Sequence, residues 1–144
     1  MNIFEIGPVL SDVALDITVE CIDDRGIHHR LDAVLDYRRS DPFAIAMTFI
    51  TGAGDLVWTF GRDLLSHGIV SPVGEGDVHV APAIGLSGTA MVSIELTSPD
   101  GHLVLQALTT DVTEFLARSF AVVPDGAESD HFDVDSLISQ VLAA

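Results

Sequence analysis

Runs in which apolar and polar side chains alternate restrict the fold of this sequence more than any other feature. One run extends from Val13 to Ile22 and a second from Ile27 to Tyr37, with a Gly-containing turn at 23–26 between them. Because successive side chains of a β-strand point to opposite faces, each run predicts a strand with one buried face. Two such strands joined by a short turn predict an antiparallel hairpin.

The same pattern predicts two units of four strands and a helix. Strands at Phe43–Thr51 and Leu56–Phe60 precede a short helix from about Arg62 to His67, with Asp63 in its first turn and Gly68 placed to end it. The second unit comprises expected strands near 69–73, 78–81, 89–97 and 102–108 and a longer helix capped by Thr109 or Thr110. The predicted fold class is α+β, with two antiparallel four-stranded meander sheets, each followed by a helix.

The end of the chain carries an apolar stripe at helical spacing, formed by Val134, Leu137, Ile138, Val141 and Leu142. Asp133 precedes the stripe and is the expected cap of a short C-terminal helix. A helix of about two to three turns is not stable alone in water, so it must dock on its own domain or on a neighbouring molecule. The length is typical of one domain, and residues 1–144 are interpreted as a single domain.

The charge balance disfavours one class of partner. The chain has 22 acidic residues against six basic ones, all arginine, and a net charge of -16. Affinity for nucleic acid or anionic lipid depends on Lys and Arg, so we expect no nucleic-acid binding and favour protein partners with a basic patch. The single Cys21 indicates a reducing, cytoplasmic compartment, and no run reads as a membrane span.

Motifs for catalysis, cofactors and metals are incomplete. The glycines at 52–54 and 74–76 lack the third glycine of a dinucleotide loop, and a P-loop needs a lysine. Ser87 lies between two predicted strands, whereas a nucleophile elbow joins a strand to a helix. The histidines show no metal-ligand spacing, and Asp133 and Asp135 form only a fragment of a calcium loop. We therefore expect no enzyme, cofactor or metal site.

Arg62 is unusual because a cation in the first turn of a helix opposes the helix dipole. Two interpretations are open: a structural ion pair with a neighbouring carboxylate, or a contact with a partner protein. We favour the structural interpretation, with the motif from Trp58 to Leu65 acting as a scaffold for a nearby contact surface. Trp58 and Phe60 are expected to pack in the core, although exposed aromatic rings could stack on single-stranded bases.

The motif Trp58-Thr59-Phe60-Gly61-Arg62-Asp63-Leu64-Leu65 also carries a family resemblance. Residues that extend it are Gly68, Pro72, Gly74, Gly76 and Asp77-Val78, with Asp41 to Ala44, Ser98 to Gly101 and His131 to Asp135. In this order, from about Asp36 to the C-terminus, these elements resemble the SsgA-like family of sporulation and cell-division proteins from filamentous actinobacteria. The family has no catalytic residues, so Trp58, Phe60, Arg62, Asp63, Leu64 and Leu65 are identified only as motif or protein-interaction positions.

The resemblance implies a non-enzymatic regulator that binds septation proteins and helps to position the division machinery built on the tubulin-like protein FtsZ. The implied partners are FtsZ and SsgA-like relatives, and the implied location is the cytoplasm at the division septum. The implied fold resembles the whirly-type domain, assembled as a homo-trimer. Two rival functions remain, a whirly-like module that binds single-stranded nucleic acid and an unrecognised enzyme. The acidic composition argues against the first, because stacking platforms need an electropositive groove.

Overall fold

The computed structural model describes residues 11–99, 101–131 and 134–143, with the side chains of 136 and 137 left aside. Its elements follow the order of two units of four strands and a helix that the alternation predicts. In chain order they are β1 (Val13–Ile22), β2 (His28–Tyr37), β3 (Ala44–Thr51), β4 (Gly54–Gly61), α1 (Arg62–Gly68), β5 (Val73–Glu75), β6 (Val78–Ile84), β7 (Ala90–Ser98), β8 (Gly101–Leu108), α2 (Thr109–Val122), a short 3-10 turn η2 (Glu128–His131) and α3 (Val134–Ala143).

All eight strands belong to one antiparallel sheet, in the order β4-β3-β2-β1-β8-β7-β6-β5. The prediction of two separate four-stranded sheets is therefore wrong. The two meanders are joined because β1 pairs with β8 over four residues, from Val19 opposite Ala107 to Ile22 opposite Val104. The alternating pattern identifies neighbours along the chain, but it does not report a pairing between the first strand and the last.

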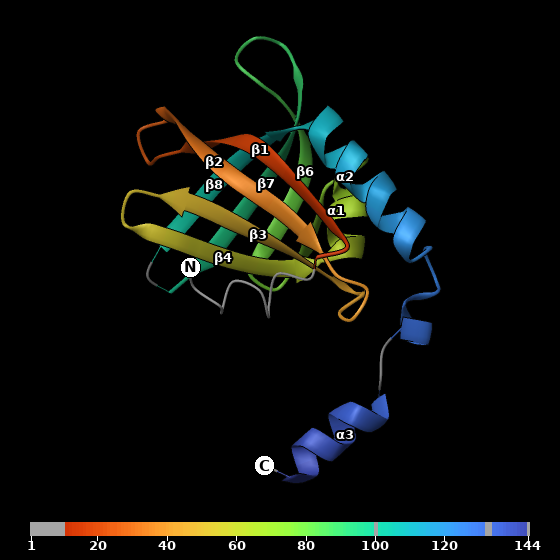
Figure 1. The fold of residues 1–144 in the computed structure, drawn as a ribbon. Coiled ribbons are helices and arrows are strands. Elements are labelled where there is room, and N and C mark those ends of the chain that lie inside the picture. The colour runs from red at the N-terminus through yellow and green to blue at the C-terminus, as the bar shows by residue number, and fades with distance from the viewer. Residues whose placement is uncertain (1–10, 100, 132–133, 144) are drawn as a thin grey trace, which may run out of the picture.

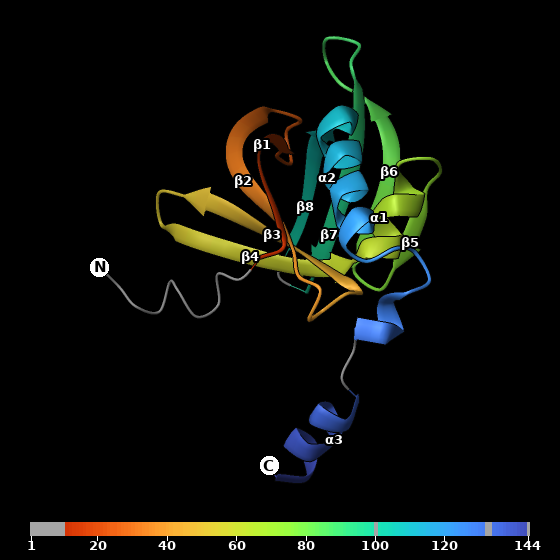
Figure 2. The ribbon, with the colours of Figure 1, turned by 45° about the vertical axis from the view of Figure 1, so that its right-hand side comes forward.

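The sheet curls, so that β2 to β4 cross in front of β6 to β8, and α1 and α2 lie side by side against one side of it (Figures 1 and 2). The alternation correctly predicts the inward face: Ile17 and Val19 on β1, Ala33, Leu35 and Tyr37 on β2, and Ile45, Met47 and Phe49 on β3 are buried. Phe43, predicted in phase with this face, is instead 50% exposed and precedes the strand.

Gly68 permits close packing of α1 on the sheet and does not end the helix in the predicted way. Gly68 is the last residue of α1, its φ is not positive, and the C-cap residue is Ile69 in right-handed helical geometry. A Cβ atom built on Gly68 would lie 2.2 Å from Cγ1 of Val80 on β6, a distance that no real Cβ contact tolerates. Only glycine lets this helix approach β6 so closely.

The remaining helices differ in how they are capped and covered. Leu108 is the N-cap of α2 and makes no side-chain capping bond, so the predicted threonine cap is wrong. The predicted C-terminal helix is confirmed as α3, but its expected cap, Asp133, lies outside the described residues. Figures 1 and 2 show α3 standing apart from the sheet. Within the described part of the chain, no helix has both the length and the apolar character needed to cross a bilayer.

Candidate functional site

The motif from Trp58 to Leu65 is organised around a buried arginine. Arg62, the first residue of α1, is only 1% exposed, and its Nη2 lies 2.9 Å from Oε2 of Glu128. Removing a charge from water costs several kcal/mol unless a partner compensates it, and this carboxylate supplies the opposite charge. The structural interpretation of Arg62 as an ion-paired interior residue is confirmed.

The same guanidinium closes the C-terminal end of α2. Nη1 of Arg62 donates hydrogen bonds to the carbonyl oxygens of Val123, at 2.8 Å, and Ser119, at 3.2 Å. The last carbonyls of a helix have no partner within it, and α2 has no basic residue in its last turn. Arg62, which precedes Ser119 by 57 positions, therefore stabilises these carbonyl groups as a basic residue in the last turn of the helix would.

Two aromatic rings complete the surroundings of the guanidinium. Its central carbon lies 4.2 Å from the centroid of the Phe120 ring and 4.8 Å from that of Tyr37. A desolvated cation near the face of an aromatic ring gains about 2 kcal/mol, so both rings favour the charged form in the interior. Tyr37 is itself held in place, because its hydroxyl donates a hydrogen bond of 2.9 Å to the carbonyl oxygen of Pro42. We call this arrangement of Arg62, Glu128, Tyr37, Phe120 and the end of α2 the Arg62 latch.

The electrostatics of the Arg62 latch follow from these contacts. The hydrogen bond from Arg62 is the largest cause that lowers the pKa of Glu128 below its usual value, with backbone N–H donors adding to it. Burial raises the pKa of the Tyr37 hydroxyl, partly opposed by the positive charge of Arg62. Glu128 is therefore ionised at neutral pH, and the latch holds a charged pair within the fold.

The other motif residues divide between the interior and the surface. Phe60, Leu64 and Leu65 are buried, at 7%, 8% and 0% exposure, and Trp58 is partly buried against the same core. The prediction that Trp58 and Phe60 pack in the core is confirmed. Of the other five motif residues (Trp58, Phe60, Asp63, Leu64 and Leu65), Asp63 is exposed. The motif residues therefore pack α1 against the core. A direct contact between the motif and a partner protein stays a prediction.

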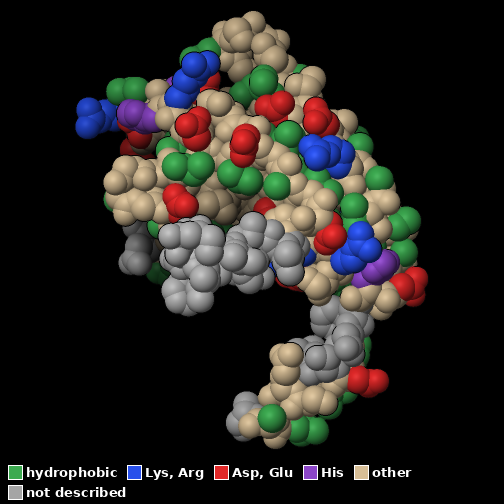
Figure 3. Space-filling model, viewed as in Figure 1, with side chains coloured by type: hydrophobic (Ala, Val, Ile, Leu, Met, Phe, Trp, Pro, Cys, Tyr) green, Lys and Arg blue, Asp and Glu red, His purple; other side chains and the backbone are tan. Residues whose placement is uncertain are grey.

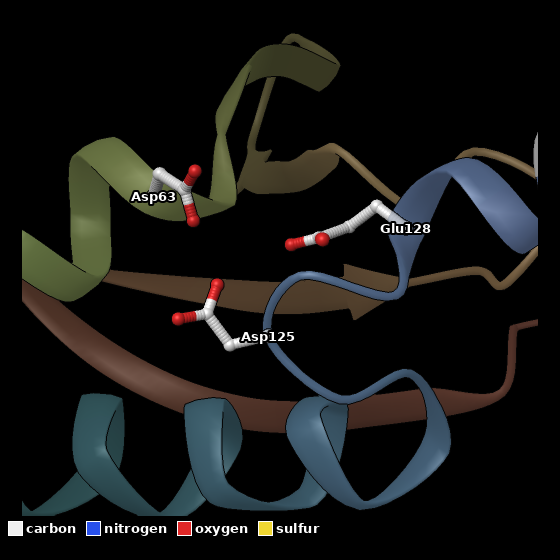
Figure 4. A group of neighbouring side chains, drawn as sticks. All are labelled: Asp63, Asp125 and Glu128. Atoms are coloured by element: carbon white, nitrogen blue, oxygen red, sulfur yellow. The ribbon is translucent and has the colours of Figure 1, made fainter.

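Three carboxylates gather where α1 meets the segment after α2. Oxygen atoms of Asp63, Asp125 and Glu128 lie within 4.8 Å of one another, and Figure 4 shows them pointing toward a common space. Both oxygens of Glu128 are already in use, since Oε2 accepts from Arg62 and Oε1 accepts from the backbone N–H of Gly126 at 2.8 Å. Two remaining carboxylates fall short of the six to eight oxygens that Ca²⁺ takes.

Sequence reasoning missed every partner of Arg62. Glu128 lies in the segment from Pro124 to Asp130, whose turn residues and acidity predict a solvated link. The one available signal was indirect: an arginine at an unfavourable helix position implies a carboxylate nearby, but not which one.

Comparison with known proteins connects this architecture to a family. A family model described as "Streptomyces sporulation and cell division protein, SsgA" matches residues 31–128, a range that contains both Arg62 and Glu128. The chain belongs to the SsgA family. The match begins within β2 and ends on the carboxylate that pairs with Arg62, so the latch lies inside the part of the chain that defines membership.

Relatives of the SsgA family match most of the chain. A protein named sporulation-specific cell division protein SsgB from Kineococcus radiotolerans is 38% identical over 134 residues, which cover 92% of this chain and 81% of the relative. SsgB of Streptomyces coelicolor is 45% identical over 112 residues, covering 77% of this chain and 81% of the relative.

Solved structures of the SsgA family share the fold. A structure of SsgB, described in connection with longitudinal cell division during sporulation of Streptomyces coelicolor, has a TM-score of 0.79 at 37% identity and covers 83% of this chain and 94% of its own. An SsgA-like sporulation-specific cell division protein from Thermobifida fusca has a TM-score of 0.79 at 36% identity, covering 89% and 93%. The curled antiparallel sheet with few helices is therefore the fold of the family.

Proposed function

We propose that this protein is a non-enzymatic regulator of cell division during sporulation, which binds septation proteins and helps to position the FtsZ-based division machinery. The observation that carries the proposal is the match over 92% of the chain to a relative named sporulation-specific cell division protein SsgB. In this proposal the chain works in the cytoplasm at the division septum, as a homo-trimer with a whirly-like fold, and contacts FtsZ and SsgA-like relatives.

The structure supports a binding role through its surface. Apolar side chains that remain more than 60% exposed include Leu56 and Val57 on β4 and Val141 and Leu142 on α3. Apolar surface of this kind, on a chain with a net charge of -16, suits association with proteins that carry basic patches. Figure 3 shows carboxylates spread over the sheet face seen in that view, with apolar side chains between them.

Binding to purified FtsZ from the source bacterium tests the proposal directly. We expect saturable binding with a Kd of about 0.1 to 10 μM, which weakens with salt because the chain is strongly acidic. A single-stranded DNA oligonucleotide is the matched competitor, since it represents the rival function. DNA binding with steep salt dependence, together with no binding to FtsZ or to SsgA-like relatives, would contradict the proposal and favour the nucleic-acid module.

A further inference from the structure

The strand β4 forms one edge of the sheet. All eight of its residues, from Gly54 to Gly61, pair with β3 on one side. On the other side, no strand of residues 11–99, 101–131 or 134–143 pairs with it. The opposite edge of the sheet is different, because β5 has only three residues and lies against α1.

The register determines which backbone groups of β4 point outward. The N–H of Arg62 donates a hydrogen bond of 2.8 Å to the carbonyl oxygen of Phe43, one step beyond the pair of Ala44 and Gly61. In an antiparallel ladder, hydrogen-bonded pairs alternate with non-bonded pairs. Leu56, Trp58 and Phe60 therefore bond to β3, whereas the N–H and C=O groups of the residues between them point away from the sheet. These residues are Asp55, Val57 and Thr59.

Side chains on both faces of β4 leave apolar surface beside this backbone. Leu56, on the inner face, is 64% exposed, and Val57, on the outer face, is 63% exposed. Trp58 is only partly buried, next to Leu56 on the inner face. Proteins usually protect an edge strand with lysine, proline, a bulge or a short length, and β4 has none of these, only the single charge of Asp55. The described residues therefore leave the core incompletely covered along the β4 edge.

The outer face next to β4 adds a preference for positive charge. A cavity of about 230 Å³ is lined by Val57 and Thr59 of β4, by Ala44 and Ala46 of β3, and by the side chains of Asp36, Arg38, Ser40 and Asp41. It is smaller than the roughly 300 to 1,000 Å³ of small-molecule pockets, and better suited to a single side chain. Asp36 contributes a carboxylate whose Oδ1 has no hydrogen-bond partner and whose Oδ2 lies 3.7 Å from Arg38. An arginine or lysine entering over Thr59 would meet the carboxylates of Asp36 and Asp41 against the single positive charge of Arg38, so the lining has an excess of negative charge.

We propose that the β4 edge is a strand-addition site, which receives an extended segment of a partner protein. The segment pairs with the outward backbone groups of Asp55, Val57 and Thr59. It carries apolar side chains beside Leu56 and Trp58 and a basic side chain beside Thr59. This inference rests on the proposed protein-binding function and names the chemistry of the partner. A second copy that pairs through its own β4 suits the edge less well, because β4 carries no basic side chain to place beside Asp36 and Asp41.

Amide hydrogen exchange on the full chain, followed by NMR, tests the edge directly. The probe is a synthetic peptide in which valine alternates with threonine and arginine, and the control peptide has proline at its central valine, so it lacks an edge donor. In the chain alone, we expect fast exchange at Asp55, Val57 and Thr59 and slow exchange at Leu56, Trp58 and Phe60. The arginine peptide should slow exchange at Asp55, Val57 and Thr59 at least about tenfold, and the control peptide should not.

Variants at position 57 separate backbone pairing from side-chain contact. Val57→Pro removes an outward N–H and leaves the ladder with β3 intact, whereas Val57→Thr keeps the N–H and replaces only one methyl group by a hydroxyl. We expect Val57→Pro to weaken binding of the peptide at least about tenfold and Val57→Thr no more than about threefold. An unchanged affinity in Val57→Pro would overturn the proposal, and the exchange pattern of the unmodified chain keeps it testable if that variant fails to fold.

Two further outcomes would assign the edge to another occupant. Slow exchange at Val57 and Thr59 that appears only at high protein concentration would show a second copy there. Slow exchange in the chain alone that is lost on deleting residues 1–10 would show that the chain covers its own edge. Either result overturns the partner assignment. If FtsZ or an SsgA-like relative binds Val57→Pro as tightly as the unmodified chain, the edge proposal fails while the proposed function stands.

Discussion

The helices α2 and α3 carry the same kind of apolar stripe, but the stripe of α2 is buried and that of α3 is exposed. On α2, Val112, Phe115 and Leu116 are buried, whereas on α3, Ile138 is 49% and Leu142 is 80% exposed. α2 follows β8 without an intervening residue, so it is delivered directly onto the sheet. α3 follows an acidic segment and stands apart (Figure 2). An apolar stripe indicates that a helix packs against another apolar surface. The connection before the helix determines whether its own domain can provide that surface.

The two helices also differ in how their surroundings hold them. The C-terminal carbonyls of α2 are bonded by Arg62, and the Phe120 ring on its last turns packs on the same guanidinium. For α3, the described residues provide no such contact. The free energy of unfolding should therefore respond strongly to changes around α2 and hardly at all to changes on α3, and the following substitutions test this difference.

The largest effect is expected for Phe115→Ala, which empties the centre of the buried stripe of α2. Phe115 has no exposed surface, and replacing a buried phenylalanine by alanine typically costs about 3 to 5 kcal/mol of unfolding free energy. Chemical denaturation followed by circular dichroism measures this loss. Phe115→Leu is the matched control and should recover most of it. A loss below about 1 kcal/mol would mean that α2 is not fixed to the core in solution.

Arg62→Ala should destabilise the fold by about 3 kcal/mol, since it leaves the buried Glu128 carboxylate without its partner and the Val123 carbonyl without the donor that Arg62 supplies. Arg62→Lys keeps the charge but not the fork of donors, so it should recover only part of the loss. The double variant Arg62→Ala with Glu128→Ala gives the coupling energy of the pair. An unchanged melting temperature in Arg62→Ala would refute the Arg62 latch.

Gly68→Ala should cost about 1 to 3 kcal/mol through overpacking, because the added methyl group has no room beside Val80. The glycine sets the approach of α1 to β6, and so the position from which Arg62 reaches α2. A companion change of Val80→Ala should relieve the clash, so that the double variant costs less than the sum of the single changes. Thermal melts of the three variants measure this coupling, and strict additivity would contradict the packing account.

The Arg62 latch should also weaken in acid, with a smaller effect. Because Arg62 lowers the pKa of Glu128 in the folded chain, the pair stabilises the fold fully above the unfolded pKa of about 4.3. This contribution is lost as pH falls through the lower pKa of the folded state. We expect the stability difference between the unmodified chain and Glu128→Gln to be constant from pH 7 to about 5 and to shrink below about 4. A difference that grew in acid would reverse the assigned sign.

The smallest effect is expected on α3. Ile138→Ser removes an apolar side chain that is half exposed, and such surface changes alter stability by no more than about 0.5 kcal/mol. If α3 docks on a second copy of the chain, the same variant should instead lower the mass measured by light scattering toward the 15.3 kDa of one chain. Destabilisation above about 2 kcal/mol at concentrations where the protein is monomeric would show that α3 packs on its own domain.

Local patterns in the sequence predicted local structure well and long-range pairings poorly. The alternation placed β1, β2 and β3 and identified their buried faces, because period-two burial is written into each strand separately. It could not reveal that β1 pairs with β8. The alternation in these two strands would be the same if each lay at the edge of a separate sheet. For the same reason, Arg62 was recognisable as a residue that needs a carboxylate, but Glu128 was hidden in a segment with the composition of a solvated link. The β4 edge could be found only once its neighbours were known.

The pairing of β1 with β8 has a consequence for how the chain is made. Val19 can pair with Ala107, and Arg62 with a carboxylate 66 residues further on, only after these later residues have left the ribosome. Closing such long loops costs entropy before any contact repays it, and folds rich in distant contacts form slowly. A β1 to β4 meander formed earlier would have an unpaired edge on each side and an arginine without its counter-charge, and the domain is complete only once β8 and Glu128 have been synthesised.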